Sequence, residues 1–76
     1  MTIDPDVPAP PYRQLAGILR DQIAAGTLTG RLPSEKSLCQ EYDLSQNTVR
    51  RSLDVLRKEG LIETVQGVAT FVKRQA

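Results

Sequence analysis

Two helical patterns separated by a turn of only a few residues constrain the fold of this chain most strongly. In the first pattern, Leu38 and Tyr42 lie one helical turn apart, which predicts a helix of about two turns. Ser34 is a hydroxyl N-cap for this helix, and Glu35 in its first turn suits the helix dipole. Asp43 tolerates the left-handed backbone that a tight turn requires, so we expect the helix to end there.

The second pattern begins with small polar residues and continues as an amphipathic helix. Ser45 stands at its N-cap position. Val49, Leu53 and Leu56 then recur at spacings of four and three, which predicts one buried stripe. We expect this helix to run to about Glu59, where a glycine follows.

A longer helix precedes this pair, and a β-hairpin follows it. Apolar residues at spacings of three and four predict a helix over about residues 11–25, followed by a turn-rich connector over residues 27–31. Its buried stripe is expected at Leu15, Ile18, Leu19, Gln22 and Ile23. Two β-prone runs, 61–65 and 69–72, flank a turn that contains a glycine, which predicts a hairpin. The expected fold is mainly α with a small hairpin: a winged helix-turn-helix of three helices and a two-stranded wing.

The chain is long enough for one compact core. Residues 1–10 hold three of the five prolines and show no apolar period, so we expect a flexible proline-rich arm. Residues 11–72 are expected to form the domain and residues 73–76 a short basic tail.

The sequence indicates an intracellular chain. Its single cysteine, Cys39, excludes an internal disulfide, fits a reducing compartment and is expected to pack in the core. There is no apolar run of 18 residues and no signal-peptide pattern at the N-terminus. We therefore expect a cytoplasmic location and no membrane partner.

The polar start of the second helix of the pair is the candidate DNA-reading element. In a helix-turn-helix this end enters the major groove of duplex DNA. Ser45, Gln46, Asn47 and Thr48 are short or carry amides, and Arg50 is long enough to reach guanine or a phosphate. Arg51 is turned away by about 100° and is expected to neutralise phosphates or Asp54. Residues 45–76 hold six bases against three acids, although the whole chain has a net charge of only +1.

An alternative function is a winged-helix module that binds another protein, without DNA, through the same helix. Such modules tend to expose apolar or acidic residues there, and the amides and arginines of this chain weigh against that function. We do not expect an enzyme, a cofactor or a metal site. The sequence has no histidine, no paired carboxylates in an apolar setting, no phosphate-binding loop and no metal-ligand cluster.

Several stretches of the chain, taken in order, match the pattern of a known family. They are PPYRQLA at residues 10–16, LPSEKSL at 32–38, LSQNTVRRSL at 44–53, LRKEGLI at 56–62 and QGVATFV at 66–72. Over roughly residues 10–72 the sequence resembles the GntR-type DNA-binding domain. The resemblance implies DNA contacts from Lys36, Ser45, Gln46, Asn47, Thr48 and Arg50, and contacts of the wing residues Gln66 and Gly67 with a minor groove. It also implies a transcriptional repressor that binds an inverted-repeat operator, with a second copy of itself on the DNA.

The chain departs from the pattern of this family at several positions. Gln46 stands where an arginine is usual, and Arg51 stands where an acid is usual. Val65 and Val68 replace the arginines that usually flank the wing glycine, so the wing has lost charge while the preceding helix has gained it. Residues 1–76 do not match the C-terminal ligand-binding and dimerisation domain that the resemblance implies for the family, so we expect no effector site within them.

Overall fold

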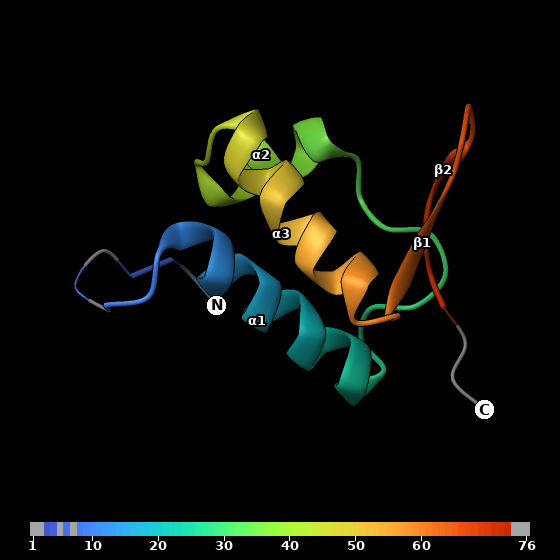
Figure 1. The fold of residues 1–76 in the computed structure, drawn as a ribbon, viewed down its shortest axis with the longest axis horizontal. Helices are drawn as coiled ribbons and strands as arrows, with labels where there is room; N and C mark the ends of the chain where they lie inside the picture. Colours follow the sequence, from blue (N-terminus) through green and yellow to red (C-terminus); the bar gives the residue numbers. More distant parts are fainter. Residues whose placement is uncertain (1–2, 5, 7, 74–76) are drawn as a thin grey trace.

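The computed structural model describes residues 3–4, 6 and 8–73, which form three helices and a two-stranded sheet (Figure 1). The elements are α1 (Pro11–Ala25), α2 (Glu35–Tyr42), α3 (Gln46–Lys58), β1 (Ile62–Val65) and β2 (Ala69–Val72). Helices α1 and α3 lie side by side, α2 lies at the N-terminal end of α3, and the hairpin extends from its other end (Figure 1). The three helices and the hairpin that the sequence predicts are confirmed.

Local signals set the helix ends where the sequence predicts them. Pro11 occupies the first position of α1, and Gly26 ends that helix in the left-handed conformation with φ of 78°. The Ser34 hydroxyl accepts a hydrogen bond from the Ser37 N–H at 3.1 Å and caps α2. Asp43 ends α2 with φ of 55° and turns the chain toward α3.

The core is one aliphatic cluster, to which the three helices, the connector and β1 contribute. Its buried members are Leu15, Ala16, Leu19, Leu32, Leu38, Val49, Leu53, Leu56 and Ile62. The predicted stripe of the third helix is therefore confirmed. The stripe of the first helix is confirmed at Leu15, Ile18 and Leu19, which are buried, whereas Gln22 and Ile23 are only half-buried. Cys39 packs against the cluster while partly buried. The apolar periodicity did not predict that Leu32 is buried, because this residue lies outside a helix. Leu32 is buried where the connector passes beside the hairpin.

A buried serine joins the two long helices. Ser52 of α3 is fully buried, and its Oγ lies 2.7 Å from the carbonyl oxygen of Tyr12 and 3.1 Å from that of Thr48. A buried hydroxyl without a partner would destabilise the fold, so this contact with α1 satisfies it. It fixes the first turn of α1 against the N-terminal half of α3.

The connector after α1 extends the sheet, which the sequence did not predict. Strands β1 and β2 pair antiparallel, with Ile62 opposite Val72. On the outer edge of β2, the Leu32 N–H donates to the Thr70 carbonyl oxygen at 2.8 Å, and the Val72 N–H donates to the Gly30 carbonyl oxygen at 2.7 Å. A stretch this short has no alternating pattern to reveal such pairing.

An ion pair joins the far ends of the same two helices. Arg20 Nε of α1 donates to Glu59 Oε1 at 2.8 Å, just after α3 ends. This hydrogen bond raises the pKa of Arg20 and lowers the pKa of Glu59. Both side chains are well exposed, so the pair adds little to stability and mainly orients the two helix ends.

The described part of the arm runs along α1. The Gln14 side chain accepts a hydrogen bond from the Asp4 N–H and donates to the Ala9 carbonyl oxygen. Flexibility of the arm stays a prediction, and residues 1, 2, 5, 7 and 74–76 of the predicted arm and tail lie outside the described residues.

The core makes a direct prediction for Leu53, which is only 3% exposed. Leu53→Ala should lower the free energy of unfolding by about 2–5 kcal/mol, because it leaves a cavity among packed side chains. Val68→Ala, at a side chain that is 61% exposed, serves as the control and should change it by about 0.5 kcal/mol or less. Urea unfolding followed by circular dichroism measures both. Equal unfolding midpoints for the two variants would contradict the packing described here.

Candidate nucleic-acid interface

The start of α3 is a capped helix end with exposed polar side chains. The Ser45 hydroxyl accepts a hydrogen bond from the Thr48 N–H at 3.2 Å and lies 2.9 Å from the Thr48 hydroxyl. Gln46, Asn47 and Arg50 are exposed, and Thr48 is half-buried. The structure therefore places the predicted α3 residues together at the surface, on a helix end that a local cap holds in place.

Glu35 of α2 holds two of these side chains on one face. Gln46 Nε2 donates to Glu35 Oε1 at 3.2 Å, and Arg50 Nη2 lies 3.5 Å from the same oxygen. Gln46 and Arg50 share a face of α3 because they are about one turn apart. From the sequence, Glu35 was expected only to interact with the helix dipole of α2. Its contact with α3 depends on how α2 and α3 cross, and no spacing in the sequence signals it.

Arg51 points to a different neighbour. Its guanidinium carbon lies 4.2 Å from the centroid of the Tyr12 ring in α1, a cation–π contact. The expectation that it neutralises Asp54 is wrong, because Asp54 pairs with Arg57 instead. Helical side chains lean toward the N-terminus of their helix, so Arg57 leans back toward Asp54 while Arg51 leans away from it.

The tip of the hairpin lies beside the start of α2. A groove of about 380 Å³ separates them, lined by Ser34 and Glu35 on one side and by Gly67 and Val68 on the other. Gly67 takes the left-handed conformation that the tight turn requires, with φ of 77°. Because α3 also contacts Glu35, the starts of α2 and α3 and the hairpin tip border one continuous surface, which we call the candidate interface.

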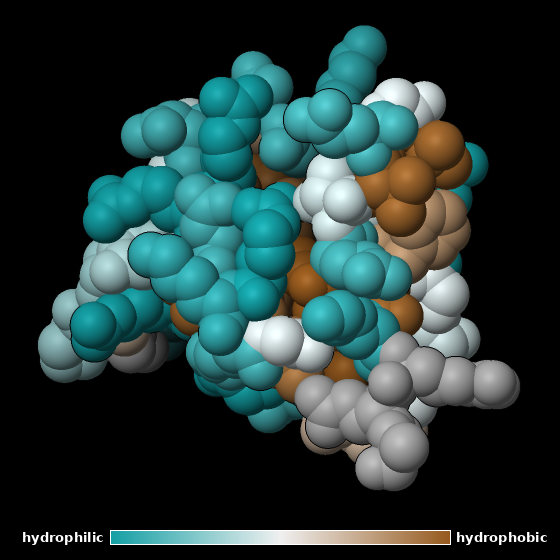
Figure 2. All heavy atoms as spheres, turned by 45° about the vertical axis from the view of Figure 1, so that its right-hand side comes forward, coloured by the Kyte–Doolittle hydropathy of each residue, from teal (hydrophilic) through white to brown (hydrophobic). Residues whose placement is uncertain are grey.

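The two sides of the candidate interface differ in character. Lys36, in the first turn of α2, is exposed, as are Gln66 and Gly67 at the hairpin tip. Val65 and Val68 are the exposed large hydrophobic residues of the described chain. Figure 2 shows a hydrophobic patch at the upper right of a mainly hydrophilic surface. The interface is therefore polar and basic at α3 and apolar at the hairpin tip.

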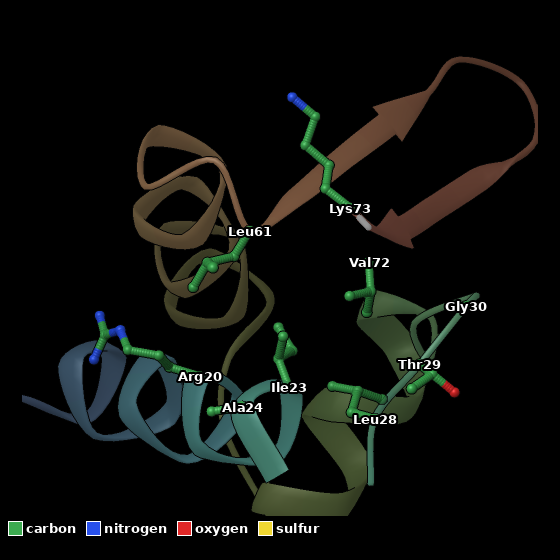
Figure 3. A pocket seen from close by; sticks show the side chains of 9 residues that line it. All are labelled: Arg20, Ile23, Ala24, Leu28, Thr29, Gly30, Leu61, Val72 and Lys73. Atoms are coloured by element: carbon green, nitrogen blue, oxygen red, sulfur yellow. The ribbon is translucent and has the colours of Figure 1, made fainter. Parts of the chain in front are cut away.

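A larger groove of about 780 Å³ lies elsewhere and shares no lining residue with the candidate interface. It has an apolar floor that includes Ile23, Leu28 and Leu61, between α1, the connector and the base of the hairpin (Figure 3). The charged ends of Arg20 and Lys73 point away from this floor (Figure 3).

Among the described residues, no three His, Cys, Asp or Glu side chains lie together as metal ligands would. None of the described helices has the length and apolar character of a membrane span.

A short helix, a tight left-handed turn and a second helix with an exposed polar start make a helix-turn-helix, and the hairpin that follows makes it a winged helix-turn-helix domain. The sequence also matches the model of the family "Bacterial regulatory proteins, gntR family" over residues 11–72. The chain belongs to this family, which confirms the resemblance found in the sequence.

The curated relatives are transcription regulators. The chain is 41% identical over 68 residues to the mannosyl-D-glycerate transport/metabolism system repressor MngR of Escherichia coli, covering 87% of this chain and 28% of the relative. It is 37% identical over 76 residues to the HTH-type transcriptional repressor NagR of Bacillus subtilis, covering 97% and 31%. The chain thus spans about three tenths of the length of these relatives.

Solved structures share the whole fold. The DNA-binding domain of AraR in complex with an operator matches with a TM-score of 0.85 at 28% identity, covering 96% of this chain and 93% of that one. YtrA from Sulfolobus acidocaldarius, a GntR-family transcription factor, matches with a TM-score of 0.88 at 31% identity, covering 99% and 81%. The winged helix-turn-helix fold predicted from the sequence is confirmed.

The cap at Ser45 makes a prediction for the stability of the candidate interface. Ser45→Ala should lower the free energy of unfolding by about 1 kcal/mol, because the Thr48 N–H loses its acceptor. Ser45→Asp should keep most of that stability, since a carboxylate also caps a helix start. Urea unfolding of both variants measures the difference. The cap would be refuted if alanine and aspartate at this position gave the same stability.

Proposed function

We propose that this chain is a sequence-specific, double-stranded DNA-binding transcriptional regulator, and that it acts as a repressor. The observation that carries the proposal is the exposed group of Gln46, Asn47 and Arg50 at the capped start of α3. Two comparisons support it. The AraR domain, which the chain matches over nearly its whole length, was solved with an operator, and MngR and NagR are named as repressors.

In the proposed mode, the start of α3 lies in the major groove. Gln46 and Asn47 have the amide geometry to pair with adenine, and Arg50 has the fork that pairs with guanine O6 and N7. Glu35 contacts Gln46 and Arg50, and these contacts orient the two side chains before DNA binds. The 3.5 Å pair of Arg50 is exposed and weak, so exchanging Glu35 for DNA costs little.

The remaining predicted residues surround these base contacts. Ser45 and Thr48 offer hydroxyls, and Lys36 and Arg51 offer charge, to phosphates of the DNA backbone. Gln66 and Gly67 at the wing tip would enter the adjacent minor groove, where Val65 and Val68 add apolar rather than charged contacts. We also propose that the chain acts in the cytoplasm and is not an enzyme, as its membership of a family of regulatory proteins supports.

A protein-binding module is the competing function. The exposed face of α3 would then be expected to carry apolar or acidic side chains, whereas it carries amides and two arginines. Its basic and amide character favours the grooves and phosphates of DNA.

The proposal predicts a specific loss for Arg50→Ala on an operator selected from random duplex DNA. Operator binding should weaken by about 1–3 kcal/mol, and preference at one base pair should relax if the contact is to guanine. Lys58→Ala removes the same charge from the exposed far end of α3 and should bind nearly like the parent chain.

Fluorescence anisotropy at two salt concentrations measures both variants, with circular dichroism to confirm folding. For the parent chain, log K should fall by about 0.9 per phosphate contact for each tenfold rise in salt. A folded Arg50→Ala variant that binds like the parent chain, or an affinity that does not depend on salt, would contradict the proposed docking.

We further propose that two copies bind an inverted repeat as a pair that is weak or absent without DNA. The aliphatic side chains of α1 and α3 are already committed to one small core, which leaves little apolar surface for an obligate dimer. Sedimentation of the free chain should therefore show mainly monomer, while a footprint should cover two half-sites about one helical turn apart. A tight dimer without DNA, or a single half-site footprint, would contradict this.

A further inference from the structure

Arg51 and Tyr12 form a pair that links α3 to α1 beside the candidate interface. The guanidinium carbon lies 4.2 Å from the centroid of the tyrosine ring, with Arg51 exposed and Tyr12 half-buried. In the described part of the chain, Glu35 pairs with Arg50 and Asp54 with Arg57, and no carboxylate forms an ion pair with Arg51. A guanidinium held over a ring face keeps those of its N–H groups that do not face the ring available for an anion.

The backbone that carries the Tyr12 ring is tied to α3. Tyr12 is the second residue of α1, and its carbonyl oxygen lies 2.7 Å from the Oγ of buried Ser52, the residue after Arg51. The stack is therefore built on backbone that is already tied across the two helices. Figure 1 shows that α1 and α3 begin at the same side of the molecule, so the stack lies at the end of α3 that carries Gln46 and Arg50.

We propose that Tyr12 is a positioning residue for DNA binding, and that its ring holds the Arg51 guanidinium in place to bind a phosphate of the DNA backbone. The inference rests on the function proposed above and adds a residue that neither the sequence nor the resemblance singled out. Arg51 is turned by about 100° from Arg50. When Arg50 faces base edges, Arg51 faces the wall of the groove, which is built of phosphates.

The stack explains why a ring at this position would matter for affinity. A free arginine side chain loses rotamer freedom when it binds a phosphate, and a side chain that is already held by a ring loses less. The contact is with the backbone, so it should strengthen binding to every DNA sequence by the same factor. Tyr12 should therefore act on affinity through Arg51 alone and leave sequence preference unchanged.

The test compares Arg51→Ala, Tyr12→Leu, their combination and Tyr12→Phe, each on the selected operator and on random duplex DNA at two salt concentrations. Arg51→Ala should weaken both DNAs by about three- to tenfold and reduce the salt slope by about 1. Tyr12→Leu should weaken both by a smaller factor. Tyr12→Phe keeps the ring face and should bind like the parent chain. The double variant should bind no more weakly than Arg51→Ala, because the two side chains act as one unit.

Three results would overturn the inference. They are a folded Tyr12→Leu variant that binds like the parent chain, additive losses in the double variant, and an Arg51→Ala loss confined to the operator. If Tyr12→Leu does not fold, proton NMR of the parent chain decides the point. The Arg51 side-chain methylenes should be shifted upfield by the Tyr12 ring, and ordinary shifts would overturn the stack.

These outcomes are separate from failure of the proposed function. A parent chain that selects no duplex DNA would remove the function itself, and a folded Arg50→Ala variant without effect would remove the proposed docking. If Arg50→Ala weakens DNA binding while the Tyr12 variants bind DNA like the parent chain, only the inference about Tyr12 is removed.

Discussion

Burial of one stripe of α3 determines the arrangement of the rest of the molecule. Val49, Leu53 and Leu56 are almost fully buried against the other elements. Because each residue turns a helix by about 100°, burying these three fixes the direction in which every other α3 side chain points. Gln46 and Arg50 then face outward beside α2, and Arg51 lies over α1. The core and the candidate interface are two faces of the same helix, so neither can rotate without the other.

Local chemistry accounts for the parts of the fold that the sequence predicted well. The ends of α2 and α3 follow from serine caps and from Asp43 in a left-handed turn, all of which act within a few residues. The polar start of α3 could also be predicted from the sequence, because a serine cap followed by amide side chains is a local pattern. Predictions carried over from the family for Lys36, Gln66 and Gly67 placed them at the surface, where the structure also has them. Their contacts with DNA stay predictions.

The unpredicted features all join residues that are distant in the chain. Glu35 meets Gln46 eleven positions later, and Arg20 meets Glu59 thirty-nine positions later. Tyr12 meets Arg51 because α1 and α3 pack against each other through the core, with Ser52 bonded to the Tyr12 carbonyl oxygen. Periodicity reports which face of a helix is buried but not which neighbour covers it. The error at Asp54 has a different, local cause: spacing along α3 allowed both Arg51 and Arg57, and side-chain direction selected Arg57.

The pairing of the connector with β2 makes the hairpin a mechanical part of the domain rather than an appendage. Backbone hydrogen bonds at Leu32 and Val72 join the connector to β2, and the connector leads directly into the Ser34 cap of α2. The hairpin is therefore joined by continuous backbone to the start of α2, where Glu35 contacts Gln46 and Arg50. Leu32 of the connector is also a member of the core, so the hairpin, the core and the starts of α2 and α3 are tied into one unit.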